Sequence, residues 1–155
     1  MLDRVRDAAG KALVDDAGAV IEAAAAMSER FRDGGRLLAL GGAADAAHVA
    51  VEFTHPVIVG KRALPAFSLG GEPALLPVLG RAGDIAVGIR AARGDLVVAR
   101  GLGMLTVALT ADEECPEADH VLVARTGDPL VAREIHITMY HLLWELVHVF
   151  QEAGE

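Results

Sequence analysis

Apolar residues recur at helical spacing through the first part of the chain, over residues 3–33. Positions three or four apart on a helix share a face, so this spacing predicts amphipathic helical structure. Two glycines inside the segment, Gly10 and Gly18, weaken the pattern because glycine lowers helix stability. We therefore expect either one bent helix or two successive helices, ended by Gly34 and Gly35.

Farther along the chain, short apolar runs bounded by glycine alternate with segments of helical spacing. Short apolar runs are typical of strands buried on both faces, and an Asp-Pro pair is typical of a helix N-terminus. The predicted strands are 36–40, 63–69, 85–89, 104–109 and 120–124, and the predicted helices are 43–54, a short one from Glu72, 95–100 and a long one from Asp128 to about Gln151. Strands separated by helices predict an α/β fold with a parallel sheet covered by helices on both faces.

The composition is that of a globular protein, with 53% hydrophobic and 23% charged residues. No repeat, low-complexity tract or linker divides the 155 residues, and this length suits one hydrophobic core. We expect a single domain over residues 1–155, with an N-terminal helical segment at 1–33 and an α/β core at 36–155. The mean hydropathy of +0.38 is high for a small monomer, which a buried interface between subunits would explain.

The charge and the missing motifs exclude several classes of protein. The formal net charge is −8, and no stretch gathers the Lys and Arg side chains that bind nucleic acid. No apolar run approaches the roughly 20 residues that cross a bilayer, and the first residues lack the order of a secretion signal. The sequence contains neither the G-x-G-x-x-G pattern of dinucleotide-binding folds nor the G-x-x-x-x-G-K pattern of phosphate-binding loops. We therefore expect no nucleotide cofactor. With one cysteine, Cys115, and therefore no internal disulfide, the chain fits a cytoplasmic protein without nucleic-acid or membrane partners.

Candidate chemistry first appears in the predicted helix 43–54, where His48 and Glu52 stand four residues apart. This spacing puts both side chains on one face of the helix. The helix follows the first strand and the turn Gly41-Gly42, at the sheet edge where open α/β folds bind ligands. Most of its other residues are apolar, so a polar pair there is costly unless it is satisfied or used. A functional pair and a structural pair are both consistent with this pattern.

The last predicted helix carries three of the six histidines of the chain, His136, His141 and His148. His141, Glu145 and His148 lie on one stripe of the helix, whereas His136 lies to one side. Apolar residues surround His136 and His148, which fit satisfied core histidines better than ligands.

Three segments resemble the phosphoheptose isomerases, a family with the sugar isomerase (SIS) fold. Residues 41–53 resemble the family's Gly-Asn-Gly-Gly-Ser…Asp-Ala-x-His-x-x-x-Glu segment, and residues 134–143 resemble its terminal-helix motif Gln-Glu-x-His-x-x-x-x-His. Residues 83–89 resemble the strand before the family's second phosphate loop. The resemblance implies a single three-layer α/β/α sandwich with a five-stranded, mostly parallel sheet. It also implies assembly as a homodimer or homotetramer.

The resemblance implies roles for three residues. In the family, a glutamate and a histidine move protons between C1 and C2 of a sugar phosphate through an enediol, and these match Glu52 and His141. Some members bind zinc through residues that match His48, Glu52 and His141, with a glutamine as the fourth ligand. Arg133 stands at the glutamine position, yet three nitrogen and oxygen ligands with a water still suit zinc.

Both phosphate-binding loops depart from the family pattern. The first lacks the extra residues, a serine among them, that separate the family's glycines from the following helix. The second is Ser/Thr-rich in the family, whereas residues 90–95 here contain no hydroxyl. We expect substrate contacts from the residues that remain at these places, with arginines as point contacts for phosphate: Gly41, Gly42, Asp45, Arg90 and Arg93.

Two functions remain open from the sequence. The first is aldose–ketose isomerisation of a sugar phosphate or related carbohydrate derivative at a metal-assisted acid/base site. The second is a catalytically degenerate SIS protein that binds a protein partner or acts as an accessory factor, because losing both loops removes most bonds to a phosphate. The first requires Glu52 and His141 to lie within hydrogen-bond reach or one bridging water of each other.

Overall fold

The computed structural model describes residues 1–111 and 117–154, so Cys115 lies outside the described residues. The helices are α1 (Leu2–Asp15), α2 (Ala17–Arg32), α3 (Ala43–Thr54), the 3-10 helix η1 (Pro73–Leu75), α4 (Leu76–Leu79), α5 (Arg93–Gly101) and α6 (Pro129–Ala153). The strands are β1 (Leu37–Gly41), β2 (Ala66–Ser68), β3 (Ile85–Ile89), β4 (Leu105–Ala111) and β5 (His120–Ala124). No described helix combines the length and apolar character that a membrane span needs.

The five strands form one sheet in the order β2-β1-β3-β4-β5, and every neighbouring pair is parallel. The sheet is thus wholly parallel, where the family resemblance implied mostly parallel. Strand β2 is shorter than the predicted 63–69. Pro65 has no amide hydrogen for the sheet, and the amide of Leu64 donates to the carbonyl of Phe53 in α3 instead.

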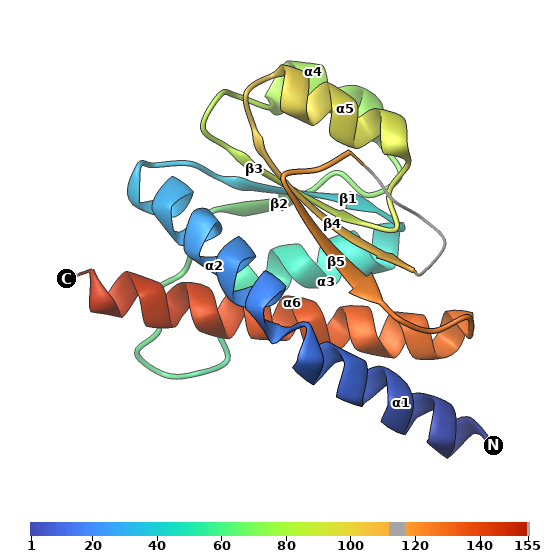
Figure 1. Cartoon of the computed structure of the whole chain (residues 1–155). Coiled ribbons are helices and arrows are strands. Elements are labelled where there is room, and N and C mark those ends of the chain that lie inside the picture. Colours follow the sequence, from blue (N-terminus) through green and yellow to red (C-terminus); the bar gives the residue numbers. More distant parts are fainter. Residues whose placement is uncertain (112–116, 155) are drawn as a thin grey trace.

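Helices cover both faces of the sheet (Figure 1). Leu37 and Ala39 of β1 pack in the larger apolar cluster with α2, α3 and α6. Leu38 and Leu40 pack in the smaller cluster, with buried residues of α4 and α5. Successive strand residues point to opposite faces, so a strand covered on both sides must be apolar throughout. This arrangement gives the three layers that the resemblance implied.

The N-terminal helical segment is two helices in succession, one of the two forms that the apolar spacing allowed. The break falls at Asp16, with φ −92° and ψ 10°, rather than at Gly10 or Gly18. The second helix ends at Arg32, two residues before Gly34, which has φ +86°. Positive φ is the conformation that glycine adopts most readily, so this position matches the predicted stop.

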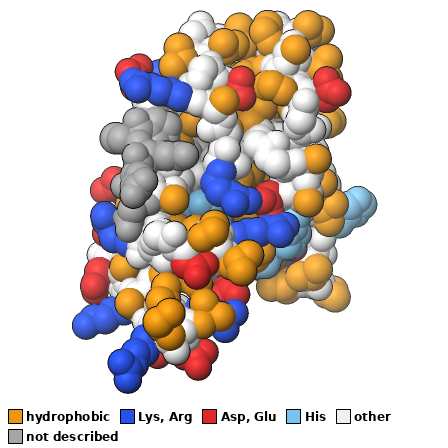
Figure 2. All heavy atoms as spheres, turned by 90° about the vertical axis from the view of Figure 1, so that its right-hand side faces the viewer, with side chains coloured by type: hydrophobic (Ala, Val, Ile, Leu, Met, Phe, Trp, Pro, Cys, Tyr) orange, Lys and Arg blue, Asp and Glu red, His pale blue; other side chains and the backbone are white. Residues whose placement is uncertain are grey.

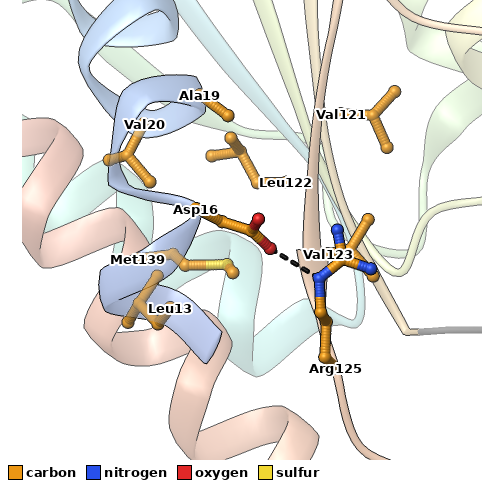
Figure 3. Close-up of a pocket in the computed structure, with 9 residues that line it drawn as sticks. All are labelled: Leu13, Asp16, Ala19, Val20, Val121, Leu122, Val123, Arg125 and Met139. Atoms are coloured by element: carbon orange, nitrogen blue, oxygen red, sulfur yellow. Dashed lines mark hydrogen bonds and ion pairs between the residues drawn. The ribbon is translucent and has the colours of Figure 1, made fainter. Parts of the chain in front are cut away.

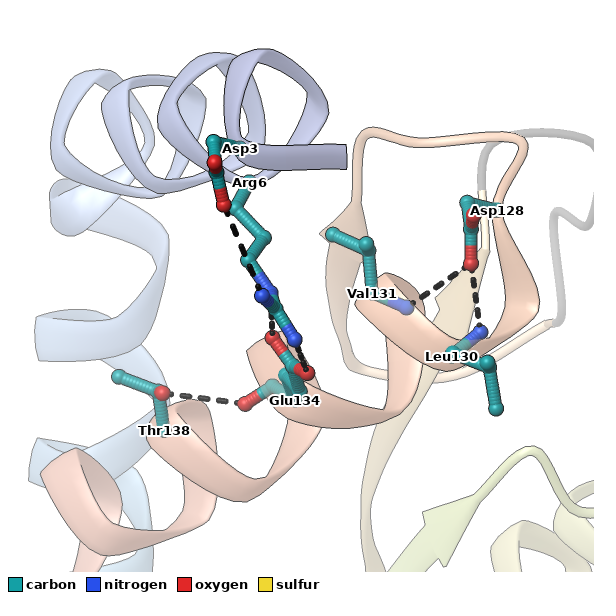
Figure 4. A network of polar contacts seen from close by, with 7 residues as sticks. All are labelled: Asp3, Arg6, Asp128, Leu130, Val131, Glu134 and Thr138. Atoms are coloured by element: carbon teal, nitrogen blue, oxygen red, sulfur yellow. Dashed lines mark hydrogen bonds and ion pairs between the residues drawn. The ribbon is translucent and has the colours of Figure 1, made fainter. Parts of the chain in front are cut away.

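Helices α3 and α6 contact each other and both begin at the carboxyl edge of the sheet. Gly41 joins β1 to α3 with φ +114°, and a Cβ atom there would lie 2.1 Å from the carbonyl oxygen of Ile89. At the start of α6, the Asp128 carboxylate accepts hydrogen bonds from the amides of Leu130 and Val131 (Figure 4). The two helices therefore run in the same direction, side by side, away from that edge.

Candidate active site between α3 and α6

His48 and Glu52 lie one helical turn apart on α3 and contact each other. Nε2 of His48 is 3.1 Å from Oε1 of Glu52. The Glu52 side chain is 16% exposed and that of His48 is 40% exposed. The carboxylate is therefore largely shielded from water, whereas the imidazole is open to solvent on one side.

His141 reaches the same carboxylate oxygen from α6. Its Nε2 lies 3.3 Å from Oε1 of Glu52, and its side chain is 46% exposed. The rings of His48 and His141 meet edge to face, with centroids 5.3 Å apart. One carboxylate oxygen is thus shared by two imidazoles from helices far apart in the sequence.

Tyr140 lies behind this group and was not anticipated from the sequence. Its hydroxyl is 2.6 Å from Nδ1 of His48, and the side chain is buried. Burial, followed by the nearby Asp45 carboxylate, raises the pKa of Tyr140 to about 12, so the phenol keeps its proton near neutral pH. When the phenol donates to Nδ1, the proton of neutral His48 lies on Nε2, facing Glu52. The signal for this role was slight: Tyr140 is the one tyrosine of the chain and precedes His141.

A second polar group lies at the carboxyl edge, around the buried carboxylate of Asp45. Nη2 of Arg90 is 2.8 Å from one carboxylate oxygen, and Nε of Arg133 is 3.1 Å from the other. The structure therefore joins Asp45 and Arg90, two expected substrate contacts, and adds Arg133 from α6. Arg93 is not part of this group: its guanidinium pairs with Glu117, and both side chains are mostly exposed.

The two glycines expected to contact substrate form the turn beside this group. Gly41 packs against the backbone of Ile89, and Gly42 is the N-cap residue of α3. No side-chain cap hydrogen bond is made at Gly42. The turn brings the start of α3 close to the end of β3, and so brings Asp45 within reach of Arg90.

His136 and His148 serve the interior of the protein, in keeping with the structural interpretation of the sequence. Both are buried. Nε2 of His136 lies 2.7 Å from the carbonyl oxygen of Thr110 on β4. The two ring nitrogens of His148 each lie 2.9 Å from a carbonyl oxygen, one of Trp144 and one of Arg62. These contacts join α6 to the sheet and to the segment after α3.

A pocket beside β5 does not compete with this site. Figure 3 shows it between the α1–α2 junction and β5, lined mostly by aliphatic side chains and crossed by the Asp16–Arg125 ion pair. The ion pair measures 2.6 Å, and the cavity volume is about 80 Å³. Small-molecule sites typically occupy about 300–1,000 Å³, so this pocket is too small for a sugar.

The donor set of His48, Glu52 and His141 fits a divalent metal ion. Their ligand atoms all lie within 4.8 Å of one another. Two ligands of a tetrahedral zinc ion, each about 2 Å from the metal, are roughly 3.3 Å apart, close to the two contacts of Glu52 Oε1. Arg133 has no acceptor atom and is bonded to Asp45, so it supplies no fourth ligand. Three protein ligands with one open position are typical of catalytic rather than structural zinc.

Several known proteins are similar to this chain over most of its length. No protein-family model matches it. It is 35% identical over 147 residues to a phosphoheptose isomerase of Desulfovibrio desulfuricans, covering 76% of this chain and 70% of that protein. It is 32% identical over 153 residues to a phosphoheptose isomerase of Pelobacter propionicus, covering 80% and 81%.

Solved structures agree with these relatives. The phosphoheptose isomerase of Neisseria gonorrhoeae superimposes with a TM-score of 0.75 at 25% identity, covering 93% of this chain and 91% of that one. That of Francisella tularensis shares the fold with a TM-score of 0.79 at 19% identity, covering 95% and 96%. The chain has an SIS-like, wholly parallel five-stranded sheet, and it is 35% and 32% identical to two phosphoheptose isomerases over 70% and 81% of their lengths. It therefore belongs to the phosphoheptose isomerase family.

Proposed function

We propose that this protein binds a sugar phosphate and interconverts its ketose and aldose forms, with Glu52 and His141 as the acid/base pair. The observation that supports this most is the sharing of Oε1 of Glu52 between Nε2 of His48, at 3.1 Å, and Nε2 of His141, at 3.3 Å. A carboxylate and an imidazole within hydrogen-bond distance can exchange the roles of base and acid near neutral pH.

The proposed reaction moves two protons and leaves no net charge. Glu52 takes a proton from C1 of the ketose while His141 donates one to the carbonyl oxygen on C2, which gives an enediol. His141 then takes the proton from the hydroxyl on C1, and Glu52 returns its proton to C2. The product is the aldose, and both side chains regain their starting protonation states.

His48 and Tyr140 support these steps by position. The Tyr140 hydroxyl holds Nδ1 of His48, which directs Nε2 toward Glu52. A metal ion held by His48, Glu52 and His141 would supply Lewis-acid polarisation of the substrate carbonyl in place of the proton from His141. The partial burial of Glu52 limits competition from water for its carboxylate.

We also propose that the chain forms a homodimer or homotetramer through α1, α2 and α6. A groove of about 640 Å³, lined mostly by aliphatic side chains of these three helices, supports this proposal. Val14, Ile21 and Val149 are large, apolar and exposed there. An aliphatic face of this kind is typical of a contact between subunits.

A second function, as a partner-binding or accessory protein without catalysis, is favoured by one observation. The segment after β3 begins with Arg90 and contains no hydroxyl through residue 95, so the family's hydroxyl-rich phosphate loop has no counterpart. The two functions differ in whether purified protein converts substrate.

The deciding experiment follows isomerisation of sedoheptulose 7-phosphate by the purified full chain, with its metal content measured alongside. We expect turnover in the wild type and a loss of at least about 100-fold in Glu52→Gln and in His141→Asn. Glu29→Gln, which makes the same change at an exposed position on α2, should retain full activity. His141→Ala should also lose bound zinc. A wild type with neither turnover nor stoichiometric metal would leave the accessory function standing.

A further inference from the structure

Two arginines from separate elements converge on one buried carboxylate at the carboxyl edge of the sheet. Arg90 follows the last residue of β3, and Arg133 lies in the second turn of α6. They bond opposite oxygens of Asp45, which is only 5% exposed. Strands β1 and β3 flank the point where the sheet order reverses direction, which is where open α/β sheets bind ligands.

The group has spare charge and spare donors. Two guanidinium groups and one carboxylate leave a net charge of about +1. A guanidinium carries five N–H donors, and the contacts among described residues occupy one on each arginine. Their side chains are 38% and 50% exposed, so the remaining donors are open to a ligand. Figure 2 shows this face, with basic side chains near its middle and histidine side chains beside them.

The backbone fixes the position of Arg90. Among the described residues it is the one non-glycine residue with positive φ, at +49°. Its amide donates to the carbonyl of Leu109 on β4, which anchors the residue at the end of the sheet. Together with the bond to Asp45, this contact holds the guanidinium in place before any ligand arrives. Fixed guanidinium groups lose little freedom on binding and pair well with phosphate oxygens.

The spacing along the helices sets the geometry of the ligand. Asp45 precedes Glu52 by seven residues on α3, and Arg133 precedes His141 by eight on α6. At 1.5 Å of rise per residue, Asp45 and Arg133 lie about 10–12 Å along their helices from Glu52 and His141. A ligand that reaches both places carries its anionic group several carbons away from the carbonyl carbon.

We propose that Arg90 and Arg133 form a subsite for the terminal phosphate monoester of an open-chain sugar, with Asp45 as the residue that positions them. This subsite takes the place of the hydroxyl-rich loops that the chain lacks. Asp45 bonds the two arginines through its two carboxylate oxygens and does not itself contact the ligand in this arrangement. The location of the reacting end of the sugar rests on the proposed function, whereas binding of the phosphate does not.

The test titrates inorganic phosphate into the full chain by calorimetry. Arg90→Gln and Arg133→Gln should each weaken binding at least about tenfold, because each removes charge-assisted bonds. Each variant leaves Asp45 one arginine partner, which favours correct folding. Arg90→Lys and Arg133→Lys keep the charge but lose the planar guanidinium group, so they should give intermediate affinities. Arg100→Gln is the control, because it removes the same charge from a side chain on α5 that is 57% exposed and pairs with Asp119. Equal affinities in the wild type and both Gln variants would overturn the subsite, and equal binding of acetate would overturn its assignment to phosphate.

A kinetic arm separates this inference from the proposed function. With sedoheptulose 7-phosphate, the arginine variants should raise KM at least about tenfold and leave kcat within a few-fold. Isomerisation whose KM ignores both arginines would overturn the subsite and leave the proposed function intact. Phosphate binding that depends on both arginines, in a protein without isomerase activity, would support the subsite and overturn the proposed function.

Discussion

The carboxylate of Glu52 joins polar side chains of α3 and α6. It contacts His48 from the same helix and His141 from the other. The i, i+4 spacing predicted that His48 and Glu52 share a face, and the structure agrees. The contact with His141 follows from the packing of the two helices, which no spacing within one segment specifies; the sequence pointed to it only through the family motifs. The contacts of Tyr140 and Arg133 were not anticipated, because each is made with a residue on α3.

At this scale the first prediction concerns Tyr140. Tyr140→Phe removes the hydroxyl that bonds Nδ1 of His48 and leaves the ring of the tyrosine in place. We expect the ring ¹⁵N NMR shifts of His48 in the metal-free protein to change from those of one dominant tautomer to those of a mixture. Thr138→Val, on the exposed side of the same helix, serves as control. Unchanged shifts in Tyr140→Phe would show that the phenol does not orient His48.

Asp84 provides a second prediction, on stability. Burial by itself raises its pKa, but hydrogen bonds from the Arg36 side chain, the Arg36 amide and the Arg81 amide outweigh burial and hold the pKa below its ordinary value. A carboxylate with a depressed folded-state pKa contributes stability that is complete above its unfolded-state pKa, about 4, and is lost as pH falls through the folded-state value. Asp84→Asn should therefore lower the unfolding free energy at pH 7 by about 2–3 kcal/mol and flatten its dependence on pH below about 4.

Urea denaturation at several pH values measures both effects of Asp84→Asn. The matched control is Glu134→Gln, which breaks the exposed, two-pronged pair with Arg6 shown in Figure 4. Water already screens that pair, so its loss should matter much less. A pH profile of Asp84→Asn parallel to that of the wild type would contradict the assignment.

Individual elements were predictable to different degrees. Strands β1 and β3 are buried on both faces, and their unbroken apolar runs made them easy to recognise. Strand β2 lies at the sheet edge, where Pro65 limits its pairing. The hydropathy of residues 63–69 does not reflect this effect, so the predicted strand was too long. The helix break at Asp16 was also hidden, because the two glycines gave a stronger signal than the residue at which the chain turns.

The connection from β1 to α3 carries the third prediction. Gly41→Ala places a Cβ atom against the carbonyl of Ile89 and forces alanine to φ +114°. We expect the free energy of unfolding to fall by at least about 3 kcal/mol. We also expect the contact between Asp45 and Arg90 to be lost, because this turn positions it. Gly10→Ala, in α1 with no atom near the added methyl group, should instead be neutral or stabilise by up to about 1 kcal/mol. Similar melting temperatures for the two variants would contradict this account.

At the scale of the whole molecule, the α/β order, the parallel sheet and the covered faces all followed from alternating apolar runs and helical segments. The strand order did not, because it depends on which crossovers the chain makes rather than on the residues of any one strand. The arginine group shows the same limit. Arg90 and Arg93 are equally basic in the sequence, yet only Arg90 reaches Asp45, while Arg133 joins it from α6.

The fourth prediction tests assembly. The wild type should be a dimer or tetramer at micromolar concentration by size-exclusion chromatography with light scattering. Val14→Glu and Val149→Glu put charges on the aliphatic face of α1, α2 and α6 and should give monomers. Val97→Glu, on α5 at the opposite face of the sheet, should leave the assembly unchanged. A monomeric wild type would refute the proposed interface.

The contact between Glu52 on α3 and His141 on α6 also has a consequence for folding during synthesis. A nascent chain that has emerged only as far as β5 carries Glu52 and His48, but neither His141 nor Arg133. It also lacks α6, which covers buried residues of α2, α3 and the sheet. The apolar cluster and the contact between Glu52 and His141 are therefore both completed only when α6 has emerged, and a chain interrupted before α6 has neither.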